Sequence, residues 1–194
     1  ARKMSRLYNH LMVLLPFEPQ YFVYQGMKCT FVGHPSAKET SAELGAKFRQ
    51  DRNIQNKLTL GIFPGSRKSE VLRMMPIFAN VVEQLAKDFP KLEIIITTVP
   101  HLKPLISFFT GGWKFRLIIV DSFLERKAAH QACNVALAAS GTITTELAAA
   151  KVPVVVGYKV SPFTAFIARR LLKISHVSLV NIVAGKRIIP EYVQ

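Results

Sequence analysis

The chain has 194 residues, 49% of them hydrophobic, and this composition excludes an intrinsically disordered protein. Lys and Arg outnumber Asp and Glu by 26 to 12, so the net charge of +14 indicates an anionic partner: nucleic acid, a phosphorylated ligand or an acidic membrane surface. Cys29 and Cys133 have neither CxxC spacing nor clustered histidines, so no metal site is expected. Nothing marks the chain as secreted, so a cytoplasmic location is expected. No apolar run approaches the roughly 20 residues of a membrane-spanning helix.

Apolar runs typical of strands recur along the chain, with helical patterns between many of them. The expected strands are 11–15, 29–33, 58–63, 93–98, 116–120, 134–138 and 153–156. Most are continuous rather than alternating, as in parallel strands that are covered on both faces. The expected helices are 70–89, with Pro76 as an irregularity, 124–132, 142–150 and 163–173. This order predicts an α/β fold with a Rossmann-like, doubly wound parallel sheet.

Two segments near the N-terminus do not fit this regular order. Residues 34–57 are polar and charged, and they are predicted to be a linker or boundary with a short helix at 41–50. Residues 1–33 have a strand–helix–strand pattern that is too short for a domain. These residues are therefore expected to belong to a larger unit.

The first candidate binding motif is the turn Pro64-Gly65-Ser66-Arg67, which joins the strand at 58–63 to a helix. Ligands of open parallel sheets bind beyond the carboxyl ends of the strands. Gly65 allows a ligand close to the backbone, the N–H groups of the new helix favour an anion, and Arg67 suits phosphate oxygens. The motif is explained equally well without a ligand, if Gly65 makes the turn, Ser66 caps the helix and Arg67 is a solvated surface residue.

A second motif of the same kind follows the strand at 134–138. Ser140, Gly141 and Thr142 precede a helix, and Glu146 lies about one turn into it. A carboxylate there can accept hydrogen bonds from a ribose diol, although by itself a first-turn Glu that complements the helix dipole is the better-supported interpretation. Together the two motifs fit a nucleoside diphosphate. Neither GxGxxG nor a Walker lysine motif is present.

A third segment, within residues 157–181, combines aromatic and basic residues at helical spacing. An aromatic, basic helix can lie on an anionic membrane surface, and a core helix with solvated basic residues is an equally supported alternative. The residues expected to face the membrane are Phe163, Phe166, Arg169, Arg170 and Lys173. The five histidines form no His–Asp–Ser or His–Cys constellation, so each is expected to be structural or on the surface.

Six segments, in order, resemble the lipid-A-disaccharide synthase family of bacterial glycosyltransferases. They are LPFEPQYF (15–22), FVGHP (31–35), FPGSRKSEV (63–71), ASGTITTELAAAKVPVVVGYKVSPFT (139–164), ARRLLK (168–173) and VSLVNIVAG (177–185). The resemblance implies the nucleotide-binding half of a GT-B glycosyltransferase fold. It implies transfer of 2,3-diacylglucosamine from UDP-2,3-diacylglucosamine to 2,3-diacylglucosamine 1-phosphate with release of UDP. It also implies no cofactor and a peripheral position on the anionic, cytoplasmic face of the inner membrane.

The same resemblance implies a UDP site. Arg67 would contact the UDP phosphates, and Glu146 would bind the ribose. The other implied members of the site are Gly65, Ser66, Ser140, Gly141, Thr142 and Asn181. The sequence departs mildly from the family at Ile143, Thr144 and Thr145, where smaller residues are common.

The family pattern also implies a domain division. Residues 1–35 resemble the last part of an acceptor-binding N-terminal domain, and residues 36–194 resemble the C-terminal UDP-sugar-binding domain. In this family the general base lies in the first of these domains, so the catalytic base is not identified and residues 1–194 alone are expected to bind UDP without catalysing transfer. Glu18, the one carboxylate in residues 1–33, is expected to cap a turn.

Two alternatives remain open from the sequence. Another UDP-sugar enzyme, such as a UDP-N-acetylglucosamine 2-epimerase or a different glycosyltransferase, would share the two helix starts. A non-enzymatic nucleic-acid-binding protein would explain the charge, but the basic residues are dispersed and no recognised motif supports a specific nucleic acid. A homo-oligomer is compatible with the sequence.

Overall fold

The computed structural model describes residues 1–35, 42–55, 58–139, 141–159 and 176–194. The chain divides into two compact units, Ala1–Glu39 and Thr40–Gln194. Unit 1 contains a short 3₁₀ turn (Met4–Arg6) and two parallel strands, β1 (His10–Val13) and β2 (Lys28–Phe31), which α1 (Pro19–Val23) connects. The predicted strand–helix–strand pattern is therefore present, although both strands are shorter than the apolar runs.

Glu18 closes the turn that precedes α1. Its carboxylate oxygen Oε2 accepts hydrogen bonds from the backbone N–H groups of Leu14, at 3.1 Å, and of Leu15, at 2.8 Å. The backbone of Glu18 is the N-cap of α1, but its side chain makes no cap hydrogen bond to that helix. Glu18 therefore caps the turn before the helix, as predicted, and not the helix itself.

In the described part of the chain, unit 2 is built on a six-stranded parallel sheet. Its strands are β3 (Thr59–Phe63), β4 (Glu93–Thr97), β5 (Arg116–Val120), β6 (Val135–Ala138), β7 (Val154–Tyr158) and β8 (Glu191–Val193). The spatial order is β5-β4-β3-β6-β7-β8. The chain moves outward from β3 through β4 to β5 and then returns to β6 on the other side of β3. The switch point of this doubly wound sheet, where ligands bind in such folds, therefore lies between β3 and β6.

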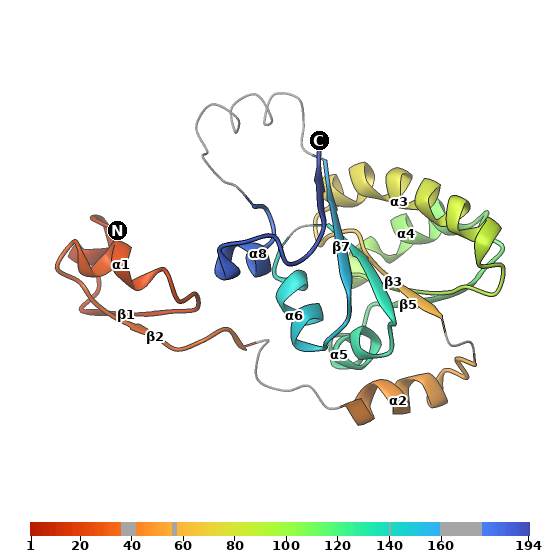
Figure 1. The fold of residues 1–194 in the computed structure, drawn as a ribbon, viewed down its shortest axis with the longest axis horizontal. Helices are drawn as coiled ribbons and strands as arrows, with labels where there is room; N and C mark the ends of the chain where they lie inside the picture. The colour runs from red at the N-terminus through yellow and green to blue at the C-terminus, as the bar shows by residue number, and fades with distance from the viewer. Residues whose placement is uncertain (36–41, 56–57, 140, 160–175) are drawn as a thin grey trace. The chain divides into compact units, whose positions relative to one another are not determined.

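Helices cover both faces of this sheet, with α3 and α4 on one face and α5 and α6 on the other (Figure 1). The bounds are α2 (Ala42–Asp51), α3 (Lys68–Asp88), α4 (Lys103–Thr110), α5 (Phe123–Gln131), α6 (Ile143–Ala149) and α8 (Leu179–Ala184), with a 3₁₀ turn at Pro100–Leu102. Helix α3 continues through Pro76. Helix α2, predicted within a linker, packs against α5 and buries Phe48, so this segment belongs to the core of unit 2.

Successive residues of the central strands enter two different cores. Leu60 and Ile62 of β3 pack in the cluster that contains the apolar residues of α3 and α4, whereas Phe63 packs in the cluster that contains those of α2, α5 and α6. Ile94 and Ile96 of β4 belong to the first cluster in the same way. Apolar side chains on both faces explain why the strands appear in the sequence as continuous apolar runs.

Gly61 is closely packed within β3. A Cβ atom at this position would lie 2.7 Å from the Cys133 Sγ atom and 2.7 Å from the Phe63 ring. Such overpacking typically costs about 1–3 kcal/mol, so Gly61→Ala is expected to lower the free energy of unfolding by that amount. In Gly112→Ala, the matched control, the added Cβ meets no atom within 4 Å. Urea unfolding measures both, and equal midpoints for the two variants would contradict the packing around Gly61.

Candidate functional site

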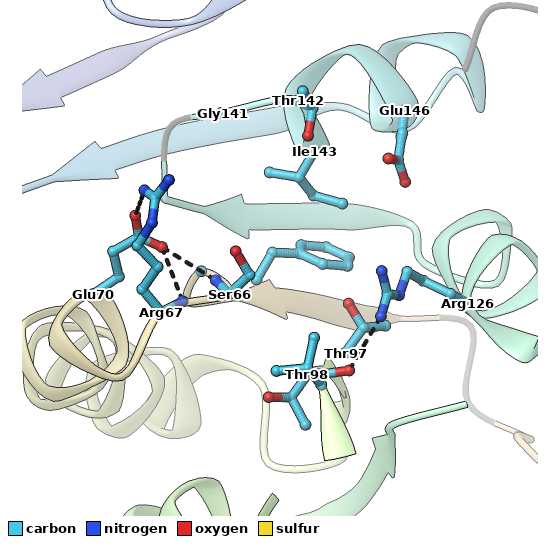
Figure 2. A pocket seen from close by; sticks show the side chains of 13 residues that line it. Ser66, Arg67, Glu70, Thr97, Thr98, Arg126, Gly141, Thr142, Ile143 and Glu146 are labelled. Atoms are coloured by element: carbon cyan, nitrogen blue, oxygen red, sulfur yellow. Dashed lines mark hydrogen bonds and ion pairs between the residues drawn. The ribbon is translucent and has the colours of Figure 1, made fainter. Parts of the chain in front are cut away.

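A pocket of about 350 Å³ lies at the switch point of the sheet. Its lining comes from the last residues of β3 and β4 and from the segments that follow β3, β4 and β6, together with one side chain from α5 (Figure 2). The contributors from the first of these junctions are Phe63, Gly65, Ser66, Arg67 and Glu70; the others are Thr97, Thr98, Val99, Arg126, Gly141, Thr142, Ile143 and Glu146. The volume is within the range of small-molecule sites, which starts at about 300 Å³.

The turn after β3 places glycine where no other residue fits well. Helix α3 begins at Lys68, and its N-cap is the extended residue Arg67 rather than Ser66. Gly65 has φ of +108°, and a Cβ atom there would lie 2.5 Å from the Glu70 Oε2 atom. Both the backbone conformation and the close carboxylate therefore require glycine at this position.

Glu70 occupies the anion-binding start of α3. Its Oε2 atom accepts hydrogen bonds from the backbone N–H groups of Ser66, at 3.1 Å, and Arg67, at 3.3 Å, and its Oε1 atom lies 2.8 Å from the Arg67 guanidinium (Figure 2). These are the groups that the sequence predicted for a ligand phosphate, so the carboxylate already satisfies them. Glu70 was not predicted from the sequence, although its position three residues after the N-cap is typical of a capping box.

The contact between Glu70 and Arg67 is weak enough to exchange. The Arg67 side chain is 78% exposed and the Glu70 side chain is 16% exposed, so the arginine half of the pair is largely solvated. Solvated pairs of this kind contribute about 0–1 kcal/mol. An anionic ligand with more than one charged oxygen can therefore compete for Arg67 and for the two N–H groups.

The junction after β6 brings Gly141 and Thr142 to the pocket, while Ser140 lies outside the described residues. Here the hydroxyl groups serve the local backbone. Thr144 donates to the Gly141 carbonyl oxygen at 2.9 Å, and Thr145 donates to that of Thr142 at 2.6 Å. These bonds explain how the two threonines are accommodated at the start of α6. Helix α6 begins at Ile143 and is shorter than predicted.

Glu146 lies in the first turn of α6 and lines the pocket, as Figure 2 shows. Its side chain is 33% exposed, and its Oε2 atom lies 3.4 Å from the His130 Nδ1 atom. The carboxylate is thus half-buried at the wall of the pocket. Its binding role remains a prediction.

Arg126 supplies a second permanent cation, which was not predicted from the sequence. It comes from α5, and its Nη2 atom lies 3.5 Å from the Thr98 carbonyl oxygen that accepts its hydrogen bond. The guanidinium also lies over the Phe123 ring, 5.6 Å from the ring centre. Helix α5 follows β5, so a basic residue in its first turn reaches the same edge of the sheet as Arg67. That position in the chain order is the signal that could have identified Arg126.

Asn181 does not line this pocket. It is fully buried in α8, and its amide donates to the Ile189 carbonyl oxygen at 2.9 Å and to the Glu191 carboxylate at 2.8 Å. Its side-chain oxygen Oδ1 accepts hydrogen bonds from the backbone N–H groups of Ile188 and Ile189. The structure therefore uses the side chain of Asn181 to connect α8 to the loop before β8, and its place close to the nucleotide remains a prediction.

Other predictions fall outside what the structure describes. Phe163, Phe166, Arg169, Arg170 and Lys173 lie outside the described residues. Among the described residues, no helix has both the length and the apolar character to cross a membrane. No group of three or more His, Cys, Asp and Glu side chains is arranged there to hold a metal ion.

The chain is similar to known proteins in fold and in sequence. The chain resembles the glycosyl transferase family 9 protein of Veillonella parvula with a TM-score of 0.50 and 15% identity, over 71% of this chain and 46% of that one, which supports the fold alone. Lipid-A-disaccharide synthase of Rhodospirillum centenum is 38% identical over 100% of this chain and 49% of that protein. The Rickettsia felis synthase is 38% identical over 100% of this chain and 50% of that protein.

The chain thus spans about half the length of the curated relatives that it matches. The family model described as lipid-A-disaccharide synthetase matches residues 1–194. On this match and these identities, the chain belongs to the lipid-A-disaccharide synthetase family.

Proposed function

We propose that the pocket between β3 and β6 binds the UDP part of a UDP-activated sugar, UDP-2,3-diacylglucosamine. The whole protein would transfer the diacylglucosamine to 2,3-diacylglucosamine 1-phosphate and release UDP. One observation carries this proposal: two arginines, the N–H groups at the start of α3 and a carboxylate line one pocket at the switch point of the sheet.

The proposed roles follow from the chemistry of each group. Arg67 and the N–H groups of the Ser66–Arg67 turn would bind a phosphate after Glu70 moves aside, because these groups already bind a carboxylate. Arg126 would face the same anion from the opposite side of the pocket. Such fixed positive groups also stabilise the charge that develops on a departing UDP. Glu146 would accept hydrogen bonds from the ribose diol, and Gly141 and Thr142 would border the ligand.

The domain assignment is part of the same proposal. Residues 1–35 would belong to the acceptor-binding half, and residues 36–194 would form the UDP-sugar-binding half. No cofactor is needed for this reaction. The alternatives drawn from the sequence, a UDP-N-acetylglucosamine 2-epimerase and a nucleic-acid binder, have less support because the family match covers the whole chain.

Calorimetry with UDP, UMP and uridine tests the proposed ligand. Each charge-assisted contact to phosphate adds about 1.5–3 kcal/mol, so UDP is expected to bind at least roughly tenfold more tightly than uridine, with UMP between them. Uridine binding as tightly as UDP would contradict the proposal. A single-stranded RNA is the control, and RNA affinity that persists well above physiological salt would instead favour specific nucleic-acid binding.

Peripheral membrane association through residues 163–173 is the finer part of the proposal. The segment carries Arg169, Arg170 and Lys173, and each basic residue near an anionic surface contributes about 1 kcal/mol. Changing all three to Gln is expected to weaken the binding free energy for anionic vesicles, measured by sedimentation, by up to about 3 kcal/mol. Binding to neutral vesicles should change little. Equal, salt-independent binding to both vesicle types would rule out the electrostatic contribution.

A further inference from the structure

The histidine in the last turn of α5, His130, lies directly behind the proposed ribose-binding carboxylate. Its side chain is buried, with 2% of its surface exposed, and its Nδ1 atom lies 3.4 Å from the Glu146 Oε2 atom. The Nε2 atom on the other side of the ring lies 3.5 Å from the Thr97 Oγ1 atom. The ring packs edge-on against Phe63, with 5.1 Å between ring centres. Packing and two polar neighbours therefore fix the position of the imidazole.

The Nδ1 atom is close to Glu146 but not aligned with it. Although the distance is 3.4 Å, the Nδ1 atom is buried and makes no hydrogen bond with the described residues. A buried polar atom without a hydrogen bond is destabilising, so an adjustment that aligns the Nδ1–H group with the carboxylate is favoured. Polar contacts in unliganded sites are often poorly aligned and shorten when the ligand binds.

We propose that His130 is a positioning residue, whose Nδ1–H group donates to Glu146 Oε2 and holds the carboxylate so that its other oxygen faces the ribose diol. This inference rests on the proposed function, because it assigns a support to the group that would recognise the sugar. The Thr97 hydroxyl would donate to Nε2 and so fix the tautomer that has its proton on Nδ1.

The electrostatics of the site agree with a neutral imidazole in this role. Burial, reinforced by the positive charge of Arg126, lowers the pKa of His130 to about 4. Near neutral pH the ring therefore has a single N–H group to donate. A neutral donor leaves the negative charge on Glu146, and that charge strengthens the hydrogen bonds that the carboxylate accepts from a diol.

Two substitutions separate the two ring nitrogens. In His130→Asn the side-chain amide can reach the position of Nδ1, whereas in His130→Gln it can reach only that of Nε2. Calorimetry with UDP and with 2′,3′-dideoxyuridine diphosphate then measures diol discrimination, the ratio of the two dissociation constants. We expect roughly 10- to 150-fold discrimination in the wild type, most of which His130→Asn retains. In His130→Gln the diol discrimination should fall below about threefold, whereas the affinity for the dideoxy ligand should stay within about twofold of the wild-type value.

If His130→Gln loses the same amount of affinity for UDP and for the dideoxy ligand, the proposal is overturned, because a merely structural role weakens the binding of both. Full discrimination in that variant would also overturn it. Since a buried substitution can prevent folding, ¹⁵N-imidazole spectra of the wild type provide a second test, assigned by substituting the other histidines one at a time. A proton on Nδ1 supports the contact with Glu146, and a proton on Nε2 overturns it. If the wild type fails to bind UDP, the proposed function fails, while the tautomer still decides the role of His130.

Discussion

Arg67→Ala is expected to lower the affinity for UDP by about 1.5–3 kcal/mol, which is roughly 10- to 150-fold. The guanidinium lines the pocket beside the Ser66–Arg67 turn, where its planar N–H groups can bind two phosphate oxygens at once. Arg67→Lys should recover only part of the loss, because an ammonium group keeps the charge but not the paired geometry. Isothermal calorimetry with UDP measures all three proteins.

Arg73→Ala is the matched control for this experiment. Arg73 is exposed on the same helix and does not line the pocket. Its removal changes the net charge by the same amount as Arg67→Ala and so reports the general attraction between a basic protein and an anion. If the two variants lose the same amount of UDP affinity, net charge rather than a site at the start of α3 attracts the nucleotide.

Glu70→Gln is expected to act in the opposite direction and to strengthen UDP binding. The Glu70 carboxylate holds the N–H groups of Ser66 and Arg67 together with the Arg67 guanidinium, and a ligand phosphate must displace it. Glutamine can keep the capping geometry without the charge, and a neutral hydrogen bond is about 1 kcal/mol weaker than a charge-assisted one. UDP affinity should therefore rise roughly fivefold.

The control for this prediction is Glu83→Gln, an exposed carboxylate further along α3. It removes the same charge without touching the turn, so its effect on UDP affinity should be small. Weaker UDP binding in Glu70→Gln would contradict the exchange between carboxylate and phosphate. It would indicate instead that Glu70 holds Arg67 in the orientation that the ligand needs.

Much of the fold was predictable because its signals are local. Continuous apolar runs of three to six residues indicated β3 to β7, and the helical spacing of Val71, Met75 and Phe78 indicated α3. Strand β8 was missed because it has only three residues, of which just Tyr192 and Val193 are apolar, and so it forms no apolar run. Helix α4 was missed because Lys103 and Pro104 begin a short segment without a strong cap.

The part of the pocket that the sequence predicted is centred on its two glycine turns. Gly65 and Gly141 each follow an apolar strand, and adjacency in a parallel sheet brings such turns together. Arg126 could have been identified from its place in the first turn of the helix after β5, whereas His130 reaches the site through the packing of α5 on the sheet, which no local pattern encodes. The spacing of Glu70 from Arg67 is visible in the sequence, but the sequence alone does not show that the carboxylate turns back to the Ser66 and Arg67 N–H groups.

A crystal structure of residues 1–194 with UDP is the most direct test of the central claim, that this pocket binds a nucleoside diphosphate at the start of α3. We expect a phosphate oxygen within about 2.7–3.2 Å of the Ser66 and Arg67 N–H groups, the Glu70 side chain turned away, and the ribose at Glu146. UDP bound elsewhere, with the Glu70 carboxylate still on those N–H groups, would contradict it.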